Sequence, residues 1–192
     1  MSLLELIGRA DERALAAGAV ACLERCLPLL AGPEAEPLRP LWASCEDGQD
    51  WAIRLAAVRT AMEQTAVPDG PAALVRAMLG AAPSDFAVVP LREWADACSL
   101  VALRVHGRFD VPDGDVPADE EDLLKAARGG EPAAVGPLVV GELERQVRIL
   151  EILAETTGTA GSGAGLRKAL DLSTEGRRVL RAVMSRRARS RG

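Results

Sequence analysis

Apolar residues recur at alternating steps of three and four in two long segments of this chain. The series are Leu91, Trp94, Cys98, Val101 and Val105 in residues 90–106, and Val140, Leu143, Val147, Leu150 and Ala154 in residues 137–156. This spacing places apolar side chains along one face of an α-helix, as in the seam between packed helices. The two segments therefore predict amphipathic helices that pack in a bundle.

Prolines, glycines and capping residues predict where the other helices begin and end. A helix is predicted over residues 3–31, in which Gly18 allows a close helix crossing and Pro28 kinks the last turn. The remaining predicted helices cover residues 49–66, 71–80 and 119–128, with a short helical turn near 38–44, an acidic loop over 107–118, and a terminal helix capped by Ser173. The only short strand candidates are Phe86–Val89 and Val135–Val140. The predicted class is all-α, a bundle of about five to seven helices.

The composition also favours one helical core followed by an appendage. Hydrophobic residues make up 48% of the 192 residues and aromatic residues only 3%, so Leu, Val, Ile and Ala must form the core. We predict a helical bundle domain over 1–157, a flexible linker over 158–165 and a basic amphipathic helix over 166–192. The linker, GTAGSGAG, follows no strand and lacks the Gly-Lys-Ser/Thr ending of a phosphate-binding loop.

Charge is distributed unevenly along the chain. The net charge is −5, yet residues 166–192 contain nine basic residues and two acidic ones. Residues 1–165 contain 14 basic and 26 acidic residues, a net charge of −12. Two oppositely charged parts of one chain indicate an interaction role for at least one of them. Only Lys125 and Lys168 of the 23 basic residues are lysine, which is typical of a high-GC bacterial genome.

The sequence predicts a cytoplasmic protein that does not enter a membrane. No apolar run approaches the roughly 18 residues that span a bilayer. The first residues carry Glu5, Asp11 and Glu12 instead of the basic start of a signal peptide. The four cysteines, Cys22, Cys26, Cys45 and Cys98, are then expected to be free thiols in a reducing compartment.

Candidate catalytic and metal-binding residues are few. His106 is the only histidine, and the cysteines contain no Cys-x-x-Cys pair of the kind that structural zinc sites use. The acidic run from Asp110 to Asp122 does not fit a calcium-binding EF-hand, because Phe109 and Val111 would fall on ligand positions. The cysteines are expected to be small core residues. We predict no catalytic residue, no metal site and no cofactor.

Two segments of the chain resemble parts of one known family. Residues 172–180 have the sequence LSTEGRRVL, and residues 143–151 have the sequence LERQVRILE. The first resembles the segment that follows the wing in winged-helix regulators of the multiple-antibiotic-resistance type, and the second is similar to the end of their recognition helix. The resemblance implies a winged-helix fold and binding to duplex DNA. Glu144 and Glu151 in the second segment carry the same sign of charge as phosphate.

Three classes of function stay open at this point. Scarce catalytic residue types and plentiful amphipathic helices favour a non-catalytic protein-interaction module, meaning an adaptor, accessory or regulatory protein that docks through its basic terminal helix. The first alternative is a nucleic-acid-binding regulator with a winged-helix-like C-terminal region. The second alternative is a small enzyme that uses His106 and the nearby acids of residues 110–122.

The predicted partner-binding residues lie on the basic terminal helix, and all are expected to be exposed. They are Arg177, Arg178, Arg181, Arg186 and Arg187. The partner is unidentified, with an acidic protein as the first option and nucleic acid as the second, and a homo-oligomer is also open. The sequence does not decide whether this helix docks on another molecule or on the 110–122 region of its own chain.

Overall fold

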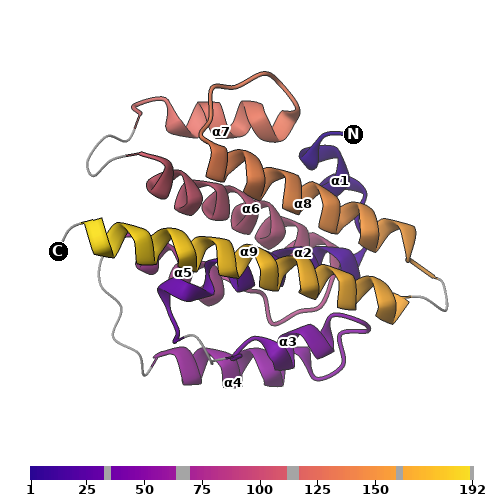
Figure 1. The fold of residues 1–192 in the computed structure, drawn as a ribbon. Helices are drawn as coiled ribbons and strands as arrows, with labels where there is room; N and C mark the ends of the chain where they lie inside the picture. The colour runs from indigo at the N-terminus through magenta and orange to yellow at the C-terminus, as the bar shows by residue number, and fades with distance from the viewer. Residues whose placement is uncertain (33–35, 64–69, 112–116, 159–161, 191–192) are drawn as a thin grey trace.

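A computed structural model describes residues 1–32, 36–63, 70–111, 117–158 and 162–190 of the chain. These residues form nine α-helices and one short 3₁₀ helix, η1 (Figure 1). The helices are α1 (Leu3–Arg9), α2 (Glu12–Cys26), η1 (Leu27–Leu29), α3 (Arg39–Ser44), α4 (Trp51–Glu63), α5 (Pro71–Gly80), α6 (Val88–Asp110), α7 (Glu120–Gly129), α8 (Pro137–Glu155) and α9 (Ser162–Ser190).

The predicted all-α class is confirmed. Throughout the described ranges there is no strand, so the two strand candidates are wrong: Phe86–Val89 leads into α6, and Val135–Val140 leads into α8. Within the same ranges, every helix is too short or too polar to cross a membrane. The predicted acidic loop over 107–118 is also partly wrong, because α6 continues to Asp110.

The N-terminal segment is two helices and not the single helix predicted over residues 3–31. Ala10 has an extended backbone, and the Asp11 side chain accepts a hydrogen bond from the amide of Ala14, which starts a new helix. Ser2 caps α1 in the same way and forms a capping box with Glu5. Pro28 lies in η1, where the α-helical hydrogen bonding ends. The cap at Asp11 therefore outweighs the continuous helical periodicity.

Helix α2 is the central element of the fold. It packs against α5, α6, α8 and α9, and thirteen of its fifteen residues are buried. Its small side chains, mostly alanine, let the neighbouring helices approach closely. The predicted close crossing at Gly18 is present, because a Cβ at this position would lie 3.2 Å from Cδ2 of Leu150 in α8.

Helices α6 and α8 lie side by side, and the buried face of α8 differs from the predicted one (Figure 1). All five predicted stripe residues of α6 are at least half-buried. In α8, Val140 is 40% exposed and Ala154 is exposed. The buried stripe lies one position earlier, at Val139, Glu142, Gln146, Ile149 and Leu153. Two of these five residues are polar, which is why apolar spacing alone selected the wrong register.

Helix α9 crosses the molecule in contact with both α2 and α8 (Figure 1). It begins at Ser162, so the second half of the predicted linker is helical, while residues 159–161 lie outside the described part of the chain. Packing against neighbouring helices offsets the low helix propensity of its glycines. Ser173 is not the predicted cap: it lies buried in the middle of α9, and its hydroxyl donates to the carbonyl of Ala169 at 2.7 Å.

We predict that Gly176→Ala destabilises the protein by about 1–3 kcal/mol, as overpacking of a core does. The new Cβ would lie 2.6 Å from Cδ and 2.9 Å from Cγ of Arg25, a side chain that is fully buried. Gly8→Ala is the matched control. Gly8 is an exposed helical residue with nothing within 4 Å of the new Cβ, so this change should stabilise by up to about 1 kcal/mol. Urea unfolding measures the free energy of unfolding of each variant. Equal stability of the two variants would contradict the close approach of α9 to Arg25.

Candidate functional site

A buried ion pair joins α2 to α8. Arg25 donates from Nε to Oε2 of Glu142 and from Nη2 to Oε1 of Glu142, both at 2.7 Å, and neither side chain is exposed. This bidentate geometry is the strongest that an arginine and a carboxylate can form. Arg25 also donates from Nη1 to the hydroxyl of Ser173 at 3.4 Å, which connects the pair to α9.

The ion pair is part of a larger group of buried polar side chains, most of them joined by hydrogen bonds. This group, the buried polar cluster, comprises Arg25, Ser99, His106, Arg128, Glu142, Gln146 and Ser173. Gln146 donates to Oε1 of Glu142 at 2.8 Å and accepts from the Ser99 hydroxyl at 2.6 Å. Arg128 of α7 donates to the same hydroxyl at 3.1 Å and forms an ion pair with Asp96. The cluster therefore connects five helices: α2, α6, α7, α8 and α9.

His106 lies inside this cluster, and among the described residues the carboxylate that it contacts is one that the sequence did not suggest. The side chain is 2% exposed, Nδ1 lies 2.8 Å from the carbonyl oxygen of Ala102, and Nε2 lies 3.7 Å from Oε2 of Glu142. The predicted pairing with the acids of residues 110–122 is absent from the described contacts.

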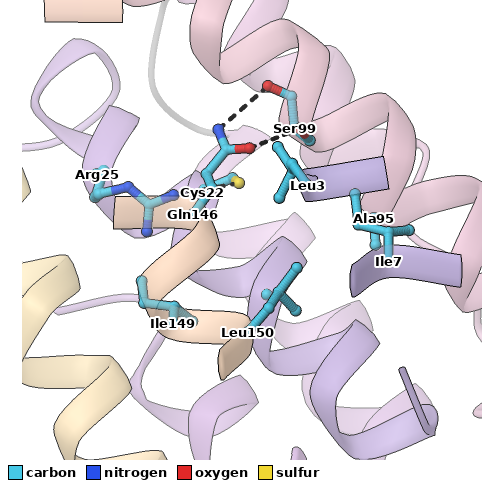
Figure 2. A pocket seen from close by; sticks show the side chains of 10 residues that line it. Leu3, Ile7, Cys22, Arg25, Ala95, Ser99, Gln146, Ile149 and Leu150 are labelled. Carbon is cyan, nitrogen blue, oxygen red and sulfur yellow. Dashed lines mark hydrogen bonds between the residues drawn. The ribbon is translucent and has the colours of Figure 1, made fainter. Parts of the chain in front are cut away.

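A cavity of about 20 Å³ adjoins the cluster (Figure 2). Apolar side chains of α1, α2, α6 and α8 form most of its wall, and Arg25, Ser99 and Gln146 provide polar groups. Figure 2 shows Gln146 bonded to Ser99, with the guanidinium of Arg25 close to Cys22. The volume suits one water molecule and excludes a substrate. The cluster thus holds helices together around a cavity of this size.

The electrostatics of the cluster favour the ion pair. Burial alone would raise the pKa of Glu142, but Arg25, His106 and the donated hydrogen bonds together lower it below its usual value. Burial opposes the charge of Arg25 as well, yet the carboxylate of Glu142 raises the pKa of Arg25 overall. Each charge is stabilised by the other, so removal of either one leaves a buried charge without its partner.

The cysteines are core residues, as predicted, and are free thiols. Burial raises the pKa of the Cys22 thiol to about 12 and raises the pKa values of Cys26, Cys45 and Cys98 as well. Such thiols are poor nucleophiles at neutral pH. Across the described ranges, no group of three or more His, Cys, Asp or Glu residues is arranged to hold a metal ion.

The five predicted partner-binding arginines fall into two groups in the structure, one turned toward the protein and one on the outer side of α9. The prediction that Arg177 is exposed is wrong, because it is 8% exposed and donates from Nη1 to Oε1 of Glu24 in α2 at 2.8 Å. The indole of Trp42 donates to the other oxygen of Glu24 at 3.4 Å. Burial raises the pKa of Glu24, although Arg177 acts in the opposite direction. This pair fixes the middle of α9 on α2.

Arg187 is also turned toward the protein. It donates from Nη1 to the carbonyl of Arg108 at 2.7 Å and from Nη2 to the carbonyl of Val111, at the end of α6. Its guanidinium carbon lies 5.6 Å from the centre of the Phe109 ring. The last carbonyls of a helix lack partners within that helix, so these hydrogen bonds satisfy two of them. The far end of α9 therefore docks on its own chain, beside the start of the acidic region.

The remaining predicted arginines lie on the outer side of α9. Arg178 and Arg186 are exposed, as is Arg189, while Arg181 is half-buried. At 3.6 residues per turn, these four fall on one side of the helix, opposite Leu180 and Arg187. We call them the α9 basic face: Arg178, Arg181, Arg186 and Arg189.

Sequence reasoning missed Arg25, Glu142 and Gln146. The sequence signal for such residues is a polar side chain at helical spacing within an apolar stripe. Arg25 directly precedes Cys26 in a segment rich in alanine and leucine. Glu142 and Gln146 are four residues apart, which places them on one face of a helix. Such residues look like solvent-facing positions unless a partner on another helix is known. The pairing of Arg25 with Glu142 spans 117 residues of sequence, and no local pattern predicts it.

Comparison of the chain with protein-family models and with curated proteins found no match, and a search of solved structures found none either. The two segments that resemble winged-helix regulators form the middle parts of α8 and α9, which pack against each other. No strand in the described ranges supplies a wing. The winged-helix fold implied by that resemblance is therefore wrong for these residues.

We predict that Glu142→Gln destabilises the protein by about 3–5 kcal/mol at pH 7, because it leaves Arg25 buried without a counter-charge. The folded-state pKa of Glu142 is lowered from its usual value of 4.5. The ionised carboxylate therefore stabilises the folded state fully above about pH 4.5, and this stabilisation is lost as the pH falls through the lowered folded-state pKa. The gap in unfolding free energy between wild type and variant should then narrow below about pH 4.5. Chemical unfolding of both proteins at several pH values from 7 to 3 measures this difference in unfolding free energy. Glu144→Gln, an exposed neighbour on α8, should change stability by less than about 0.5 kcal/mol.

We also predict that all four thiols resist alkylation in the folded protein. Their burial and raised pKa values remove both access and the reactive thiolate. Mass spectrometry after iodoacetamide treatment at pH 8 should show unmodified native protein and four modifications after denaturation. Rapid native labelling of any one cysteine would contradict the buried positions.

Proposed function

We propose that this protein is a non-catalytic protein-interaction module, and that the α9 basic face binds an acidic partner protein. The observation that carries the proposal is the concentration of exposed positive charge on one side of a docked helix. Residues 176–190 contain six arginines and no acidic residue. Arg178, Arg186 and Arg189 are exposed there. Arginine suits a carboxylate-rich partner because its planar guanidinium binds carboxylates with two parallel hydrogen bonds.

The way α9 is held supports the same proposal. The Glu24–Arg177 pair and the hydrogen bonds of Arg187 fix the helix at two places, so the basic face is presented in one orientation. A surface that is already ordered loses less conformational entropy on binding than a flexible tail does. Docking of α9 on its own chain and binding to a partner are therefore compatible, since different arginines serve each role.

The rest of the surface favours a protein partner over nucleic acid. Residues 1–165 carry a net charge of −12, which opposes a broad contact with a phosphate backbone. A single helical face with basic residues fits an acidic patch of limited size. We propose that the interaction takes place in the cytoplasm, a reducing compartment with which the four free thiols are compatible.

We predict that the triple variant Arg178→Glu, Arg186→Glu, Arg189→Glu loses the partner that wild type captures. Reversing three exposed charges turns attraction toward an acidic surface into repulsion and leaves the inward contacts of α9 in place. Wild type and the variant serve as baits in nuclease-treated extracts of the producing cells, at about 50 mM and about 300 mM salt, and the amount of partner bound to each bait is measured. The amount bound to wild type should be smaller at the higher salt, because salt screens charge interactions.

The matched control is the triple variant Arg9→Glu, Lys125→Glu, Arg148→Glu, which changes the net charge equally at exposed positions of α1, α7 and α8. It should capture the partner as wild type does. Equal capture by the α9 variant and the control would refute the basic face as the contact surface. Capture that disappears with nuclease, together with wild-type binding to duplex DNA in titrations, would move the assignment to nucleic acid.

A further inference from the structure

A cavity of about 160 Å³ lies between the end of α6, helix α7 and the start of α8. Six apolar side chains form most of its wall: Val111, Pro117, Leu123, Leu124, Val135 and Val139. It lies over a small second core made by Leu103, Leu124 and Val139. Apolar cavities of about 150 Å³ accept a molecule the size of benzene. The volume is therefore enough for a compact apolar body and excludes a nucleotide or a sugar phosphate.

Two carboxylates, Asp110 and Glu120, are the polar side chains of the described wall, and they differ in their hydrogen-bond partners. Asp110 caps α8, because its oxygens accept hydrogen bonds from the amides of Leu138 at 2.9 Å and Val139 at 3.0 Å. Glu120 forms its ion pairs with Arg104 and Arg108 at 3.7 Å, which is longer than a hydrogen bond. Its side chain is 16% exposed. Glu120 therefore keeps acceptor capacity close to the apolar wall.

The missing side chain of Gly107 leaves room beside this carboxylate. A Cβ at Gly107 would lie 3.6 Å from Oε1 of Glu120 and 3.4 Å from Cγ2 of Val139. The polar and apolar parts of the wall thus meet at one point next to the backbone of α6. Among the described residues of the wall, the side chains offer carboxylate acceptors and no donor, so a ligand that matches them brings its own donors.

We propose that this cavity is a binding site for small primary amines, in which Glu120 accepts hydrogen bonds from the ligand ammonium group and the apolar wall holds a body no larger than one ring. An ammonium group supplies three donors and a positive charge, which suits the Glu120 carboxylate, because both of its ion pairs, with Arg104 and Arg108, involve Oε2 at 3.7 Å and not Oε1. The site is separate from the α9 basic face and does not depend on the function proposed for it.

Benzylammonium and benzyl alcohol form a matched pair of probes, because they share the ring and differ in the charge of the head group. Titration of the ¹⁵N-labelled full chain, followed by amide shifts of Leu124, Gly136 and Val139, measures the affinity for each. Glu120→Gln should weaken benzylammonium binding about tenfold, the loss expected for one charge-assisted hydrogen bond, and leave benzyl alcohol almost unchanged. Gly107→Ala, which adds a methyl group without a clash, should weaken both probes.

Glu121→Gln is the control, because Glu121 neighbours Glu120 on α7, is exposed and also pairs with Arg104. It should bind both probes as wild type does, and an unchanged amide spectrum without ligand shows that each variant is folded. The proposal is overturned if benzyl alcohol binds wild type as tightly as benzylammonium, or if Glu120→Gln has no effect. It is also overturned if neither probe shifts the amides of the wall at about 20 mM, well above the millimolar affinity that such small ligands reach.

Discussion

The arrangement of the long helices depends on the ion pair between Arg25 and Glu142. Two charges removed completely from water cost several kilocalories per mole each, and only good mutual geometry offsets this. The pair reaches that geometry because α2 and α8 approach closely and because Gln146 and Ser173 satisfy further hydrogen-bonding positions. Gly176 lets α9 lie directly over the stem of Arg25. Any shift of one helix would break contacts in several others, so the cluster fixes one packing among those that alanine-rich helices allow.

The sequence was informative where apolar spacing and capping residues agreed. The helices at 71–80, 119–128 and 137–156 lie within one or two residues of their predicted bounds, since proline or acidic residues begin them and glycine or threonine ends them. Spacing failed where polar residues are buried. Glu142 and Gln146 occupy the inner face of α8, so the apolar series around them indicated a face rotated by one residue. Asp11 shows the opposite case, in which one local hydrogen bond ends a long periodic segment.

The candidate surface could be predicted only in part, for a related reason. A basic helix predicts arginines that face solvent, and four of them do lie on the outer side of α9. Arg177 and Arg187 have the same side chain and turn inward, because Glu24 and the last carbonyls of α6 lie where they can reach. Residue type did not separate the two groups. Their partners are 153 and 79 positions away in sequence, and only the three-dimensional packing brings them together.

The central position of α2 has a consequence for how the chain is made. A ribosome completes α2 early, yet Arg25 meets Glu142 only after 117 more residues, and Glu24 meets Arg177 only after 153. At bacterial or eukaryotic rates this interval is on the order of ten seconds. During it, α2 can pack against α5 and α6 but not yet against α8 and α9. The charges of Glu24 and Arg25 then serve a second purpose, since they keep the end of this apolar segment hydrated and discourage premature association. The faces of α2 that α8 and α9 cover are therefore the last parts of this helix to become buried.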